Sequence, residues 1–200
     1  MKVSTCSKLI KHSLLALLVT SSMLATASPS EEPRGVSGTL SCGGNHFIRD
    51  RGTEEQSTIF VIRNMDSSLP ISINRLTIYN AVGNVIIEHD GATLPLAFNS
   101  VIGNGDNVIE PFQTVQYRTQ ELIGAPLATA ERPIQTRIEW SADAKAIVPA
   151  VTAVRLARTI ETVLTNNGPV VRTRGERSRN SSRCRNIEIK KGNKRGHDED

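Results

Sequence analysis

Short segments in which apolar side chains alternate with polar ones dominate the hydrophobic pattern of this chain. In residues 134–142, the sequence IQTRIEWSA places its apolar or β-branched residues at every second position. Successive side chains of a strand point to opposite faces of a sheet, so this alternation predicts one buried face and one hydrated face. Trp140, the only tryptophan, is expected in the core between two sheets, where its indole N–H can reach a backbone carbonyl. A ligand-stacking role is the alternative for Trp140.

Further segments rich in β-branched residues are separated by Gly, Asn, Asp and Pro, which is typical of strands. They comprise residues 57–64, 71–80, 84–89, 114–119, 150–161 and 170–175, with edge pieces at 36–40 and 186–190. The sequences NAVGN and TNNGPV indicate hairpin turns. Residues 150–161 contain good helix formers, but their alternation favours a strand. The pattern predicts an all-β fold, an immunoglobulin-like antiparallel β-sandwich of about seven to nine strands.

Residues 1–27 have the organisation of a secretory signal peptide. Three lysines and no acidic residue accompany the apolar run SLLALLVTSSML, and the small residues ATA at 25–27 supply a cleavage site. The run is shorter than the roughly 20 apolar residues that span a bilayer. We therefore expect cleavage after Ala27, export to the periplasm or the medium, and no transmembrane segment in the mature chain. A retained membrane anchor is the alternative.

The mature chain is predicted to contain one folded domain between two disordered ends. Residues 28–35, SPSEEPRG, read as a disordered leader, and residues 190–200 as a disordered charged tail. The intervening residues 36–189 suit a single β-sandwich domain that includes the Arg-rich segment 172–189.

The charge of the chain is unevenly distributed. Loss of residues 1–27 removes three lysines and leaves 21 basic and 20 acidic residues, a formal net charge of +1. From Arg172 onward there are ten basic and five acidic residues, whereas residues 28–171 hold 11 basic and 15 acidic ones. The overall charge therefore gives no reason to expect a nucleic-acid partner, and an acidic body is followed by a basic end.

The mature chain retains only two cysteines, because Cys6 leaves with the signal peptide. Exported proteins are exposed to oxidising conditions, and a Cys42–Cys184 disulfide is therefore predicted. Closing a loop of this length would stabilise the fold by about 5 kcal/mol on the chain-entropy model. Two alternatives remain open: a zinc site formed with His46, and a reactive thiol at Cys184 activated by the neighbouring arginines.

The arginines near the end of the chain are the only feature that suggests a binding site. Guanidinium groups bind phosphate and carboxylate groups in a bidentate manner. The candidate anion-binding residues are Arg172, Arg174, Arg177, Arg179, Arg183 and Arg185. No aromatic residues are interleaved with them, so nucleic acid is not expected as the ligand. We favour a solvated tail, held to the fold through Cys184, over an anion-binding patch.

Sequence motifs for catalysis, nucleotide binding or metal binding are absent from the chain. There is no G-x-S-x-G elbow, no phosphate-binding glycine loop and no H-E-x-x-H pair. The three mature histidines, His46, His89 and His197, are scattered singly. We therefore predict no enzyme activity, no catalytic residues, no cofactor and no metal site.

Several segments resemble, in their order along the chain, an exported bacterial family of immunoglobulin-like domains without an assigned activity. They are STIFVIRNMDSSLPISINRLTIYNAVGNVI, IEWSA, PAVTAVRL and the closing TRG, within residues 57–175. The resemblance implies the sandwich fold and supplies no mechanism. The Arg-rich extension with Cys184 departs from the family pattern.

The favoured hypothesis is an exported, non-catalytic protein of the cell envelope that binds a partner, with an anionic ligand possible through the arginines. One alternative is a small periplasmic enzyme or metal-dependent protein that uses His46 and His89. Another is a structural or assembly subunit of the envelope, in which an exposed strand edge pairs with a neighbouring molecule.

Overall fold

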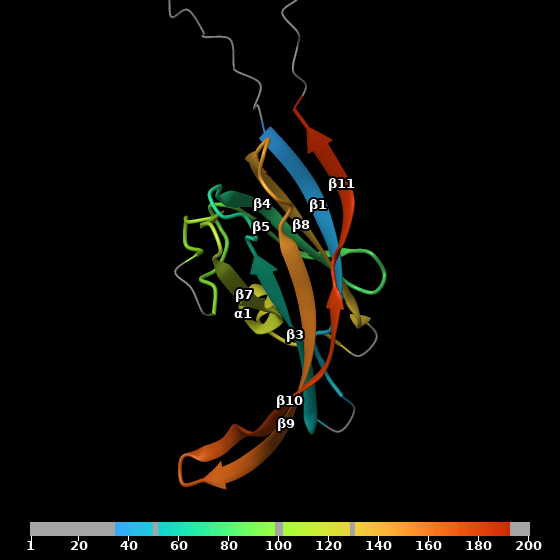
Figure 1. Ribbon diagram of the computed structural model, residues 1–200. Helices are drawn as coiled ribbons and strands as arrows, with labels where there is room; N and C mark the ends of the chain where they lie inside the picture. The colour runs from blue at the N-terminus through green and yellow to red at the C-terminus, as the bar shows by residue number, and fades with distance from the viewer. Residues whose placement is uncertain (1–34, 50–51, 99–101, 129–130, 193–200) are drawn as a thin grey trace, which may run out of the picture. The chain divides into compact units, whose positions relative to one another are not determined.

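The computed structural model describes residues 35–49, 52–98, 102–128 and 131–192 (Figure 1). The predicted signal peptide and most of the two predicted disordered ends lie outside these ranges. The described elements are β1 (Gly35–Gly44), β2 (Phe47–Ile48), β3 (Glu54–Arg63), β4 (Ile71–Tyr79), β5 (Val85–Asp90), β6 (Val108–Ile109), β7 (Thr114–Arg118), α1 (Thr119–Ile123), β8 (Ile134–Asp143), β9 (Ala150–Thr165), β10 (Gly168–Arg183) and β11 (Arg185–Lys191).

The strands form two packed antiparallel sheets, and the predicted all-β sandwich is thereby confirmed. The first sheet has the order β11-β1-β8-β4-β5, with β6 also paired to β4. The second has the order β10-β9-β3-β2, with β7 also paired to β3. Each predicted strand corresponds to an observed one. The short helix α1 was not predicted, and it takes Thr119 from the end of the strand expected at residues 114–119.

The inner faces of the two sheets form the core, as the alternation in β8 predicts. Ile134, Ile138 and Trp140 of β8 are buried, and their polar neighbours point away from the core. The predicted hydrogen bond of Trp140 is wrong, because its indole N–H has no partner among the described residues. The ring instead lies over Gly38, where a Cβ atom would come within 2.9 Å of the indole nitrogen.

Both ends of the described region differ from the prediction. Strand β1 begins at Gly35 and is an interior strand between β11 and β8, rather than an edge piece. Lys190 and Lys191, which were expected to begin a disordered tail, belong to β11 and pair with β1. These pairings provide the backbone hydrogen bonds that an isolated charged segment would have to make with water.

The last two strands connect the two sheets. Strands β9 and β10 form a long hairpin whose turn lies between Thr165 and Gly168. Only residues 150–159 of β9 also pair with β3, so the rest of the hairpin extends beyond the second sheet (Figure 1). At Cys184 the chain then passes from the second sheet into the first. The Arg-rich segment is not a free tail, because β10 pairs with β9 along its length, but its side chains are solvated as expected, since residues 169–183 are exposed.

Candidate functional site

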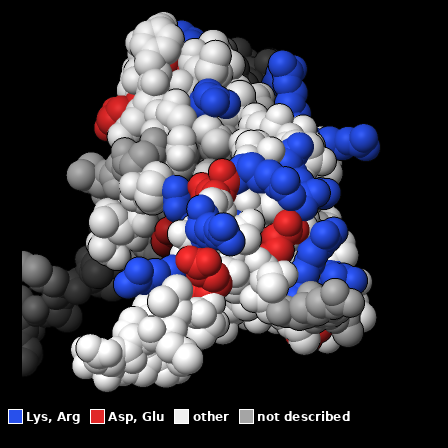
Figure 2. Space-filling model, turned by 90° about the horizontal axis from the view of Figure 1, so that it is seen from below, with Lys and Arg blue, Asp and Glu red and all other residues white. Residues whose placement is uncertain are grey.

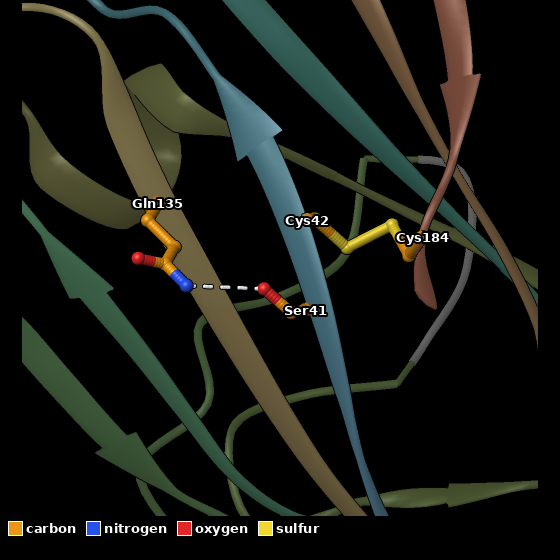
Figure 3. Close-up of a disulfide and its surroundings, with 4 residues drawn as sticks. All are labelled: Ser41, Cys42, Gln135 and Cys184. Carbon is orange, nitrogen blue, oxygen red and sulfur yellow. Dashed lines mark hydrogen bonds between the residues drawn. A yellow bond between two sulfur atoms is a disulfide. The ribbon is translucent and has the colours of Figure 1, made fainter. Parts of the chain in front are cut away.

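A disulfide between Cys42 and Cys184 fastens the point where the chain changes sheets (Figure 3). Cys42 is buried on β1, and Cys184 lies between β10 and β11, where its N–H donates a hydrogen bond to the carbonyl oxygen of Val151. The predicted disulfide is thus present. Because both sulfur atoms are used in this bond, the zinc-site and reactive-thiol alternatives are excluded in the oxidised protein.

The six arginines proposed as an anion-binding patch do not form one site. Arg177 and Arg179 both reach the carboxylate of Glu54 on β3, at 3.4 and 3.0 Å. The other four carry no ion pair to a carboxylate within the described residues; they are Arg172, Arg174, Arg183 and Arg185. Five of the six lie on β10, the edge strand of the second sheet, and Arg185 lies on β11, the edge strand of the first. Arg179 also lines a pocket.

That pocket, of about 270 Å³ and open to solvent, lies at the end of the second sheet where β9 and β10 begin to extend beyond β3. Its lining consists of three arginines and three amides, contributed by the chain around β2 and by β3, β9 and β10. These residues are Asn45, Arg49, Gln56, Arg155, Arg179 and Asn180. Figure 2 views the molecule from this end and shows basic side chains gathered here with acidic ones between them. We call this the arginine–amide pocket.

Glu54 organises one wall of the arginine–amide pocket. Its carboxylate accepts a hydrogen bond from Nε2 of Gln56 at 2.8 Å, binds Arg179 with both oxygens at 3.0 Å, and lies 3.6 Å from Nε of Arg49. The Gln56 hydrogen bond and the nearby Arg179 charge hold the pKa of this carboxyl below its usual value. Glu54 therefore stays ionised at neutral pH and holds Arg49 and Arg179 in place.

Arg155 has no such partner. It stands on the face of β9 that carries the buried residues Ala153 and Ala157, directly opposite Thr58 of β3. Its guanidinium lies over Gly43, where a Cβ atom would be 3.7 Å from Nη2. It makes no hydrogen bond or ion pair within the described part of the chain. A half-buried guanidinium with unused donors is suited to a carboxylate or phosphate ligand.

The two described histidines bind the backbone at the end of α1. Nε2 of His46 donates a hydrogen bond to the carbonyl oxygen of Gly124 at 3.1 Å. Nε2 of His89 lies 3.2 Å from the carbonyl oxygen of Leu122. Carbonyl groups at a helix C-terminus lack partners within the helix, so these contacts satisfy them. Burial lowers the pKa of His46, which favours the neutral ring. No group of three or more His, Cys, Asp or Glu residues is arranged to hold a metal ion within the described ranges.

Sequence reasoning identified Arg179 and missed the rest of the arginine–amide pocket. Its lining comes from three separate stretches of the chain, residues 45–56, Arg155 and residues 179–180, which meet through the pairing of β9 with β3 and β10. One signal was available, because Arg155 alternates with Val151, Ala153 and Ala157 along one face of the predicted strand 150–161. A charged residue at such a position requires a polar environment.

Comparisons with known proteins add no relationship: no family model matches the chain, and no curated protein or solved structure does. The resemblance to an exported immunoglobulin-like family therefore stays a prediction. The one helix in the described ranges is too short to cross a membrane.

Proposed function

We propose that this protein is an exported, non-enzymatic β-sandwich of the cell envelope that binds an anionic group in the arginine–amide pocket. The observation that carries the proposal is Arg155, a half-buried guanidinium without a partner in the described chain, beside an arginine held in place by Glu54. The ligand is a carboxylate or phosphate group of an envelope component. The disulfide is consistent with export, because such bonds persist outside the cytoplasm.

The remaining donors of the pocket suit a small oxyanion. Asn45 uses one amide hydrogen to reach Gln56 at 3.5 Å, and Gln56 in turn donates to Glu54. Three sets of donors stay available to a ligand: the second amide hydrogen of Asn45, the amide of Asn180 and the guanidinium N–H groups of Arg155. Three arginines surround the single carboxylate of Glu54, so the pocket keeps a positive charge when empty.

The alternative of a structural subunit that pairs through a sheet edge has less support. The free edge of β10 is interrupted by two bulges, between Thr173 and Gly175 and between Ser178 and Asn180. It also carries five of the six arginines considered above. Bulges and charged side chains are the features by which edge strands avoid pairing with other chains. We therefore interpret the arginines outside the pocket as protection of this edge.

The test is titration of the oxidised protein with inorganic phosphate and with citrate, followed by NMR chemical shifts or calorimetry. Arg155→Gln should abolish binding, because it removes the unpaired guanidinium and preserves the sandwich. Arg183→Gln is the matched control, an exposed β10 arginine outside the pocket, and should bind like the wild type. Equal loss in both variants would indicate non-specific attraction to the charged edge, and unchanged binding by Arg155→Gln would disprove the site.

A further inference from the structure

The tip of the β9–β10 hairpin, residues 162–171, is uncharged and exposes apolar side chains. Its sequence is TVLTNNGPVV. Leu164 is 82% exposed, Val171 65% and Val170 41%. The tip lies beyond residues 150–159, the part of β9 that pairs with β3, so no third strand supports it. A two-stranded ribbon has little stability of its own, and here it forms as the continuation of strands anchored in the second sheet.

Apolar side chains occur on both faces of the tip. The register places Leu164 opposite Pro169 on one face, and Val163 opposite Val170 on the other. Neither face is covered by the rest of the described chain. A groove or sheet on a partner protein would cover one face and leave the other in water. A lipid environment surrounds the ribbon and covers both faces together.

Arginines follow the tip directly on the side of the sandwich. We call this set the arginine collar: Arg49, Arg155, Arg158, Arg172, Arg174, Arg177 and Arg179. Four glutamates lie among them, namely Glu54, Glu55, Glu161 and Glu176, and the region therefore remains positively charged. Figure 2 shows the uncharged hairpin as a white projection at the lower left, with basic side chains and some acidic ones at its base.

We propose that the tip inserts into the surface of an anionic lipid bilayer while the arginine collar contacts the headgroup phosphates. The apolar tip would lie at the level of the acyl chains, and the positively charged collar at the level of the anionic headgroups. Four residue pairs, from Thr162–Val171 to Thr165–Gly168, at about 3.3 Å each give a tip of about 13 Å, long enough to pass the headgroups. A second copy of this chain is a poorer occupant, because its own collar would repel the first.

This proposal goes beyond the anion pocket and does not rest on it. Insertion depends on the apolar tip, whereas binding of a free anion depends on Arg155. A variant that lacks the tip side chains should keep the phosphate binding described above. Arg155→Gln should abolish phosphate binding and weaken vesicle binding only slightly, because the other six arginines of the collar remain. The vesicle experiment and the phosphate titration can therefore fail independently, and each tests one proposal.

Co-sedimentation of the oxidised protein with phosphatidylcholine vesicles, with and without phosphatidylglycerol, measures the interaction. We expect binding only where phosphatidylglycerol is present. The double variant Leu164→Asp/Val171→Asp should lower the partition coefficient by at least about tenfold, because two charges then replace apolar contacts. Val82→Asp is the control, because Val82 in the β4–β5 turn is 72% exposed, between Val171 and Leu164, and this variant should behave like the wild type.

Fluorescence distinguishes insertion from adsorption. Leu164→Trp places an indole at the tip, and Trp140, fully buried in the core, provides the background in the wild type. With phosphatidylglycerol vesicles, the variant should show a blue shift and quenching by brominated acyl chains, and the wild type should show neither.

Three results would overturn the proposal. One is absence of binding to phosphatidylglycerol vesicles. Another is binding that Leu164→Asp/Val171→Asp leaves unchanged, since the arginines alone would then suffice. The third is a wild-type protein that forms a dimer and does not bind vesicles, together with a double variant that is monomeric. The tip would then contact a second copy of the chain.

Discussion

Leu40 and Leu164 are the same amino acid on two strands of one sandwich, and the protein treats them in opposite ways. Leu40 of β1 is 1% exposed, within a core to which both sheets contribute. Leu164 of β9 is 82% exposed, on a ribbon that extends past the neighbouring strand. Burial, and not residue type, decides what a side chain contributes to stability. The apolar side chains of the tip therefore contribute little to folding and are available for binding.

The disulfide gives the largest expected effect, because it acts on the sandwich body. Replacing both cysteines, Cys42→Ala/Cys184→Ala, should lower the free energy of unfolding by about 5 kcal/mol, the entropy of closing a 142-residue loop. Urea unfolding of the variant and the wild type measures the difference, with the m-value fitted separately for each protein because the unfolded chain is less compact without the disulfide. A loss below about 1 kcal/mol would mean that the β10–β11 crossing holds without its covalent bond.

The paired substitutions Leu40→Ala and Leu164→Ala test the comparison directly. Leu40→Ala leaves a cavity between the sheets and should cost about 2–5 kcal/mol. Leu164→Ala removes atoms that are already in water and should change stability by less than about 0.5 kcal/mol. Thermal and urea unfolding report both values. A large loss for Leu164→Ala would show that the tip packs against the rest of the chain, which would also weaken the case for membrane insertion.

The sequence predicted the body better than the hairpin tip or the arginine–amide pocket. The alternation around Trp140 depends only on local periodicity, and the cysteine pairing only on there being two candidates. The pocket depends on which strands are neighbours: Glu54 meets Arg179 because β3 and β10 both flank β9. The hydrophobic pattern within one segment does not show which other strand it lies beside in the sheet. The helix α1 has only five residues, too few to show a period.

The smallest predicted effect concerns His46, a titratable residue of the sandwich body. The hairpin tip, residues 162–171, has no titratable side chain. Burial lowers its pKa in the folded protein below 6.5, so the unfolded chain binds the proton more readily. The stabilisation is complete above the pKa that His46 has in the unfolded chain. It is lost as the pH falls through the lower pKa of His46 in the folded protein. The slope is at most about 1.4 kcal/mol per pH unit.

His46→Gln keeps a donor for the carbonyl oxygen of Gly124 and removes the titration. Urea unfolding between about pH 5 and 8 should therefore show a flatter pH dependence for this variant than for the wild type. Above pH 5 the carboxyl groups of Glu54 and Asp66, whose pKa values are lowered, contribute little to the slope. Parallel curves for the two proteins would show that His46 is not the group that titrates. The pH sensitivity would then have to come from another part of the body.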